Sequence, residues 1–214
     1  MSRTQVLMEY YRAMYEALGP SNWWPAESPF EVCIGAVLTQ NTNWKNVSRA
    51  IEALREKNLL TPQGLEDLAE AQLAELIRPT GYFRVKAARI KALLDFLGRE
   101  AKHDLNRLAQ QPREEVRAKL LAVKGIGQET ADSILLYALG QPVFVVDAYT
   151  ARIMHRHGFV PEDVDYGQLQ EMFTDNLPAD VQVFNEYHAL LVRVGKTWCK
   201  KSSPVCTDCP LGQF

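Results

Sequence analysis

Hydrophobic residues recur along this chain at the spacing of an α-helix. Apolar stripes of helical period lie at Val47–Leu54, Leu65–Ile77 and Ile90–Leu97, with polar residues between the apolar positions. A further amphipathic pattern begins almost at once, at Val6–Leu18. This spacing predicts a helix in each of these segments.

One segment has the character of a strand, Val143–Val146, and it is too short and isolated to build a sheet. Glycine and proline turn signals separate the predicted helices. They are Gly19-Pro20, Thr61-Pro62, Pro79-Thr80-Gly81, Gly140-Gln141-Pro142 and Leu177-Pro178. We therefore predict an all-α protein of about ten helices, without low-complexity segments or a clear repeat.

A glycine turn joins two of the predicted helices, in the segment Val123–Ala131 (VKGIGQETA). The first helix is predicted over Pro112–Leu121 and the second over Thr130–Leu139. Gly125 and Gly127 allow positive φ and a close approach of another backbone. The amides that begin the second helix point outward, where the helix dipole favours a phosphate.

The apolar run Val143–Val146 ends abruptly on a single acid, Asp147. The segment that follows, Ala148–His157, is predicted to be a helix stopped by Gly158, so Asp147 has the position of an N-cap. A capping carboxylate can still face a cleft. Cleavage of a bond in a nucleotide also requires an acid at a fixed distance from a phosphate-binding site. Asp147 could therefore be a helix cap, a catalytic residue or both.

Composition limits the class of protein. The 214 residues are 47% hydrophobic, enough for one domain or two small ones. Without an apolar run of transmembrane length or a secretory signal, we expect no membrane partner. A net charge of −2 does not indicate a nucleic-acid binder. Basic residues nevertheless gather at Arg78, Arg84, Lys86, Arg89 and Lys91.

Three of the four cysteines lie near the end of the sequence, at Cys199, Cys206 and Cys209. This grouping favours metal ligation in a reducing cytosol over a disulfide framework. Cys33 lies in an apolar run and is expected to be buried.

Two segments have an unusual concentration of polar or aromatic residues. Leu38–Trp44 (LTQNTNW) follows an apolar run, and a capped helix end would explain it. The adjacent Trp23 and Trp24, followed by Pro25, could pack between domains or form a stacking wall for a base.

The hairpin, the VVD segment and the cysteine spacing occur in an order that resembles the helix-hairpin-helix (HhH-GPD) DNA glycosylases, the superfamily of endonuclease III. The resemblance covers roughly Trp23–Cys209. LTQNT with a following aromatic, the WWP triplet and Arg78–Phe83 resemble the 3-methyladenine DNA glycosylase III branch most. The resemblance implies a monomeric, cytoplasmic or nucleoid-associated repair enzyme that hydrolyses the N-glycosidic bond of a damaged base in double-stranded DNA.

The resemblance also implies two helical domains with a DNA-binding cleft between them. A six-helix domain would span 29–139 and contain the hairpin. The second would combine 1–28 with 140–214 and carry the cysteine loop. Composition alone does not reveal this discontinuous division.

Residue roles follow from the same resemblance. Asp147 would stabilise the positive charge that develops on the deoxyribose and activate water. Gln40 would fill the gap left by the extruded base. The base pocket would add Trp23, Trp24, Pro25 and Trp44, and the DNA backbone would meet Lys124, Gly125, Gly127 and Thr130. Proximity to DNA is likewise expected for the loop between Arg78 and Lys86.

Glu129 occupies the hairpin position of the lysine that attacks the sugar in bifunctional endonuclease III-like enzymes. A carboxylate cannot form a Schiff base, so we expect a glycosylase without efficient AP-lyase activity. Indole walls suit a cationic alkylated purine such as 3-methyladenine, through cation–π contacts of about 0.5–2 kcal/mol. Uracil or oxidised pyrimidines, or non-catalytic binding of DNA structures, are the alternatives.

The spacing Cys199-x6-Cys206-x2-Cys209 matches the start of the superfamily's [4Fe–4S] loop. The fourth cysteine of that pattern would be residue 215, which the sequence does not include. Zinc bound with a histidine such as His188, or free thiols, remain open.

Overall fold

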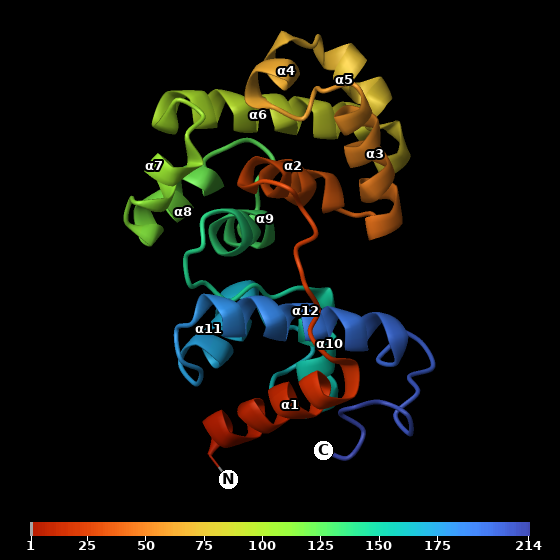
Figure 1. Cartoon of the computed structure of the whole chain (residues 1–214). Helices are drawn as coiled ribbons and strands as arrows, with labels where there is room; N and C mark the ends of the chain where they lie inside the picture. The colour runs from red at the N-terminus through yellow and green to blue at the C-terminus, as the bar shows by residue number, and fades with distance from the viewer. Residues whose placement is uncertain (1) are drawn as a thin grey trace. The chain divides into compact units, whose positions relative to one another are not determined.

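The computed structural model describes residues 2–214, and within this range all regular elements are helices (Figure 1). The prediction of an all-α fold is confirmed. The chain divides into two compact units. One is discontinuous and joins the residues up to Pro25 to Pro142–Phe214, and the other is Ala26–Gln141. The resemblance had placed these divisions after residues 28 and 139.

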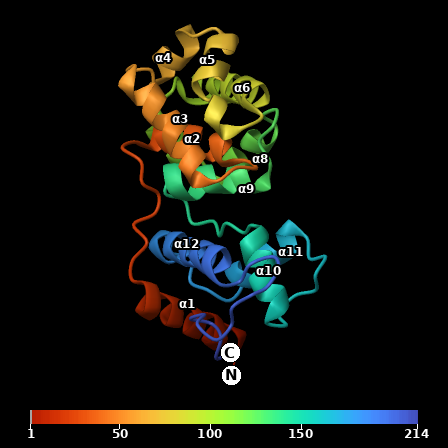
Figure 2. The ribbon, with the colours of Figure 1, turned by 90° about the vertical axis from the view of Figure 1, so that its right-hand side faces the viewer.

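The discontinuous unit contains four α-helices among its described residues. They are α1 (Arg3–Leu18), α10 (Ala148–Arg156), α11 (Tyr166–Thr174) and α12 (Val181–Thr197). Helix α12 packs against α10 and α1, and both views show these helices side by side (Figures 1 and 2).

The core of this unit explains the apolar run before Asp147. Phe144 stacks on Phe173 with ring centroids 4.1 Å apart and meets Phe184 and Tyr187 edge to face. The run Val143–Val146 is buried but forms no strand. Burial of these side chains fixes the backbone immediately before the acid, which positions Asp147 at the surface of the core.

The continuous unit is built from α2–α9, so within Ala26–Gln141 there are eight α-helices and the prediction of six is wrong. Their bounds are α2 (Pro29–Thr39), α3 (Trp44–Glu56), α4 (Pro62–Asp67), α5 (Glu70–Leu76), α6 (Phe83–Ala101), α7 (Leu105–Ala109), α8 (Arg113–Leu121) and α9 (Gln128–Ser133). A 3₁₀ turn, η1 (Arg78–Thr80), precedes α6, and a π-helical turn, η2 (Ile134–Ala138), follows α9.

Short helices account for the difference in number. The stripe Leu65–Ile77 was expected to form one helix, but Leu68 has extended backbone angles (φ −72°, ψ 134°) and divides it into α4 and α5. Residues whose side chains keep a helical period can therefore belong to two separate helices.

Helix α2 is the centre of the continuous unit. Every residue from Phe30 to Leu38 is buried, including Cys33 as expected, and α2 packs against α3, α6 and η2. A helix that is apolar on all sides belongs inside a core. Because α2 ends at Thr39, the polar segment that follows emerges directly from this core.

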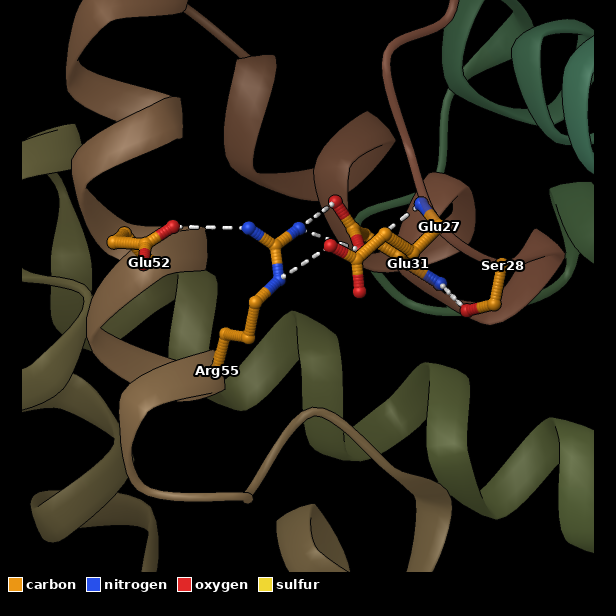
Figure 3. Close-up of polar contacts among 5 residues, drawn as sticks. All are labelled: Glu27, Ser28, Glu31, Glu52 and Arg55. Carbon is orange, nitrogen blue, oxygen red and sulfur yellow. Dashed lines mark hydrogen bonds and ion pairs between the residues drawn. The ribbon is translucent and has the colours of Figure 1, made fainter.

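Glu31 is the charged residue within that buried stretch of α2. Its carboxylate accepts hydrogen bonds of 3.0 and 3.1 Å from Arg55 of α3, and Arg55 also meets Glu52 and Glu27 (Figure 3). Ser28 caps α2 through a 3.2 Å bond from the Glu31 amide. This network compensates the burial of Glu31 and connects α2 to α3.

No helix in the described part of the chain is long and apolar enough to cross a membrane.

Candidate functional site

A tight turn joins α8 and α9 (Figure 1). Gly125 has φ of +87°, a conformation that side chains with a Cβ rarely adopt. The turn closes through a 3.0 Å bond from the Ile126 amide to the Val123 carbonyl, and both side chains are buried. Lys124, Gly125 and Gly127 remain exposed at the start of α9. The first amides of a helix have no partner within it and can bind phosphate oxygens.

A buried ion pair braces the two helices of the hairpin. Nε and Nη2 of Arg117 on α8 donate to the two carboxylate oxygens of Asp132 on α9, at 2.6 and 3.0 Å. Asp132 is fully buried, so this bidentate contact fixes the angle between the helices. The pair was not predicted, because nothing in the spacing of Arg117 and Asp132 distinguishes them from surface charges.

Gln40 lies against the same hairpin. Its Nε2 donates to the Gly125 carbonyl oxygen at 3.0 Å and to Oγ1 of Thr130 at 2.9 Å. Its Oε1 accepts a hydrogen bond from Nη1 of Arg89 on α6. Thr130 is buried, and its hydroxyl accepts a hydrogen bond from Gln40. Its contact with the DNA backbone stays a prediction.

Asp147 is the N-cap of α10, and its side chain is 12% exposed. Its Oδ1 accepts hydrogen bonds from the backbone amide and the hydroxyl of Thr150, at 2.8 and 2.9 Å. The capping role considered from the sequence is therefore present. It occupies one carboxylate oxygen and leaves Oδ2 for a second role.

The second oxygen of Asp147 lies 3.8 Å from Nε2 of His188 on α12. Burial raises the pKa of the Asp147 carboxyl, but His188 and the two bonds from Thr150 outweigh burial, so the pKa lies below its ordinary value. Asp147 is therefore ionised at neutral pH. A buried carboxylate of this kind can stabilise a developing positive charge.

The predicted aromatic residues lie in both units. The rings of Trp23 and Trp24 are 4.9 Å apart at 41°, and both side chains are half-buried. Ser21 anchors this segment to Glu186 of α12 with bonds of 2.7 and 2.9 Å. Trp44 begins α3 of the continuous unit and is also half-buried.

The basic cluster around α6 is only partly a surface feature. Lys86 is buried, and its Nζ donates to the carbonyl oxygens of Leu38 and Thr80, both at 2.8 Å. Burial, with the nearby charge of Arg89, lowers the pKa of Lys86 to about 8. The expectation that Lys86 is exposed is wrong, because its ammonium group is buried and donates to these two carbonyls. Proximity of the preceding loop to DNA stays a prediction.

The cysteine loop is held by two arginines of α10. Nε of Arg152 donates to the Cys199 carbonyl at 2.7 Å, while Arg156 donates to Cys199 Sγ at 3.2 Å and to the carbonyl of Lys200 at 2.7 Å. The three cysteines line a cavity of about 160 Å³ together with Arg156 and His157.

The three cysteine side chains do not converge on a metal site in this arrangement. Among residues 2–214, no group of three His, Cys, Asp or Glu side chains could hold a metal ion. His188 faces Asp147 and does not line the cysteine cavity, which corrects the alternative of zinc bound by His188.

The hairpin and Asp147 both lie in the part of the chain that matches a known family. The HhH-GPD superfamily of base excision DNA repair proteins matches residues 34–179, and the chain belongs to this superfamily as a DNA glycosylase. It is 42% identical over 215 residues to MJ1434 of Methanocaldococcus jannaschii, named as a candidate DNA repair glycosylase. That match covers 100% of this chain and 97% of the relative.

Two solved structures show the same fold. A Helicobacter pylori 3-methyladenine DNA glycosylase bound to 1,N6-ethenoadenine has a TM-score of 0.79 and 27% identity, covering 92% of this chain and 98% of that protein. A trapped covalent complex of endonuclease III with DNA has a TM-score of 0.83 and 25% identity, covering 99% and 94%. The predicted membership of an endonuclease III-like superfamily is confirmed.

Proposed function

We propose that this protein is a monomeric, monofunctional DNA glycosylase that releases an alkylated purine, such as 3-methyladenine, from double-stranded DNA. The observation that carries the proposal is Asp147. Its carboxylate is almost buried, ionised and fixed by Thr150 and His188. In a protein that only binds DNA, a carboxylate near the DNA would weaken binding, because the negative charge of the carboxylate repels phosphate.

The chemistry follows from the charge of the reacting groups. As the N-glycosidic bond breaks, positive charge develops on the deoxyribose, and Asp147 Oδ2 can stabilise it. Water then adds to the sugar, and the same carboxylate can accept its proton. An alkylated purine already carries positive charge, so it departs as a neutral base without protonation by a second acid.

The substrate class rests on the aromatic residues and on one relative. Trp23 and Trp24, with Pro25 beside them, offer indole faces that attract a cationic base. The Helicobacter pylori neighbour is named for 3-methyladenine and binds an adenine derivative. The similarity to endonuclease III supports a second candidate, a glycosylase acting on uracil or oxidised pyrimidines.

Base release from duplexes with single lesions tests the proposal. The panel contains an alkylated purine, uracil and thymine glycol, and released bases are separated by chromatography. We expect release of the alkylated purine. Preferential release of uracil or thymine glycol would favour the second candidate, and no release from any duplex would favour a non-catalytic DNA-structure binder.

Lys124 tests the hairpin as the phosphate anchor. Lys124→Ala is expected to weaken binding to every DNA sequence alike and to reduce the slope of log K against log salt concentration by about 1. Fluorescence anisotropy at several salt concentrations measures this slope. Lys102→Ala, which removes an equal charge at the far end of α6, is the matched control. Equal slopes for the two variants would contradict a phosphate contact at Lys124.

An iron–sulfur cluster at Cys199, Cys206 and Cys209 remains a proposal from the resemblance. Binding would require the thiolates to converge and Arg156 to release Cys199, and a fourth ligand from outside these three cysteines. Iron analysis and the visible spectrum of protein purified without oxygen test it. The contacts made by Arg152 and Arg156 lead us to expect that Cys206→Ser folds normally. Loss of folding together with loss of iron would contradict this expectation.

A further inference from the structure

Three hydrogen bonds hold the side-chain amide of Gln40 in the continuous unit. Both donors of Nε2 are used, one toward the Gly125 carbonyl and one toward Thr130 Oγ1, at 3.0 and 2.9 Å. Oε1 faces Nη1 of Arg89. Because a guanidinium has donors and no acceptor, Arg89 determines which amide atom points toward α6 and which toward the hairpin.

The Arg89 side chain packs closely against the hairpin. A Cβ at position 125 would lie 2.5 Å from Cγ and 2.6 Å from Nε of Arg89. Two features therefore favour glycine at position 125. One is its positive φ, and the other is the space that the Arg89 side chain occupies. The half-buried guanidinium lies between the turn and Gln40.

Helix α6 holds the same segment at a second point, three residues earlier. Nζ of Lys86 donates to the carbonyl of Leu38, in the last turn of α2. Lys86 thus fixes the backbone that leads into Gln40, and Arg89 fixes the Gln40 side chain. These two contacts from one helix set the position of Gln40 relative to the hairpin.

We infer that Arg89 is a positioning residue for DNA-lesion recognition: it holds Gln40 in the orientation from which its side chain supports base extrusion. This inference rests on the proposed function. Without Arg89, Oε1 loses a charged donor, and the Gln40 side chain gains rotamers that do not face the hairpin. Arg89 acts through Gln40 and does not take part in bond cleavage.

A double-mutant cycle tests the inference. Arg89→Ala, Gln40→Ala and the double variant are compared on duplexes that carry 2-aminopurine next to a lesion, where its emission reports unstacking. Arg89→Ala is expected to reduce the emission change and the single-turnover rate of base release about tenfold. In the Gln40→Ala background it is expected to have no further effect.

The controls separate positioning from general stability and charge. Arg99→Ala removes an equal charge from an exposed site on the same helix and is expected to match the wild type. Arg89→Lys retains a cation on α6 and is expected to restore part of the emission change. If Arg89→Ala has a lower melting temperature than the wild type, Arg89→Lys replaces it in the comparison.

Two results would overturn the inference. The first is an Arg89→Ala protein that behaves like Arg99→Ala. The second is a loss of equal size in the Gln40→Ala background, which would mean that Arg89 acts on DNA directly. Emission is measured independently of base release. A wild-type protein that unstacks DNA with this coupling but releases no base would therefore refute the proposed function and leave the Arg89 inference standing.

Discussion

Asp147→Asn is expected to reduce base release by at least about 10²–10³-fold while binding to lesion DNA is retained or tightened. Asn is isosteric and also caps helices well, so the bonds from Thr150 to the side-chain oxygen can persist. The negative charge facing His188 and the developing sugar cation is lost. Removal of that charge also lowers repulsion of the DNA phosphates. Single-turnover release and anisotropy measure the two effects.

Asp165→Asn is the matched control for this variant. Asp165 caps α11 in the same unit through a 2.9 Å bond from the Gln168 amide, and it is exposed. The two substitutions therefore remove equal charge from equivalent capping positions. We expect Asp165→Asn to release base at the wild-type rate. Equal activity in Asp147→Asn would show that Asp147 is a cap without a chemical role.

The wild-type protein is expected to form no covalent adduct with lesion DNA in the presence of borohydride, and Glu129→Lys is expected to gain one. Glu129 is exposed in the first turn of α9. The resemblance to the endonuclease III-like enzymes implies that this is the position of their attacking lysine. A carboxylate cannot form the imine that borohydride reduces, whereas a lysine amine can. Gel electrophoresis of labelled DNA detects the adduct.

Glu129→Gln provides the control, because it removes the negative charge at residue 129 without supplying an amine. It is expected to form no adduct and to leave strand breaks dependent on alkali. An adduct with the wild-type protein would contradict the monofunctional assignment and would direct attention to Lys124, the nearest lysine along the hairpin.

Local signals predicted the all-α fold well. Helical periodicity predicted segments of α1, α3 and α6, whereas α12 was not among the predicted helices. The glycines of the hairpin indicated a turn, and Gly125 has positive φ there. The same periodicity failed at Leu68, where a change of backbone angles leaves the apolar spacing intact. Helical periodicity also did not predict that α9 changes into a π-helical turn at Ile134.

The parts of the candidate site that belong to a short sequence motif could be predicted. The contacts between residues far apart in the sequence could not. Asp147 and the hairpin were visible in the sequence, although their chemical roles stay predictions. Lys86 and Arg89 looked like surface charge, and their bonds to Leu38 and Gln40 join residues about fifty positions apart. The contact between His188 and Asp147 also joins residues that are far apart in the sequence. Such contacts depend on packing, which sequence spacing does not encode.

The most direct test of the central claim is chromatographic detection of the free base from a duplex that contains one alkylated purine. Wild-type and Asp147→Asn proteins are compared, and each reaction is divided and analysed with and without alkali. We expect free methylated purine from the wild type, strand breaks only after alkali, and almost no release from Asp147→Asn. Release that is equal in the two proteins, or absent from the wild type, would contradict this expectation.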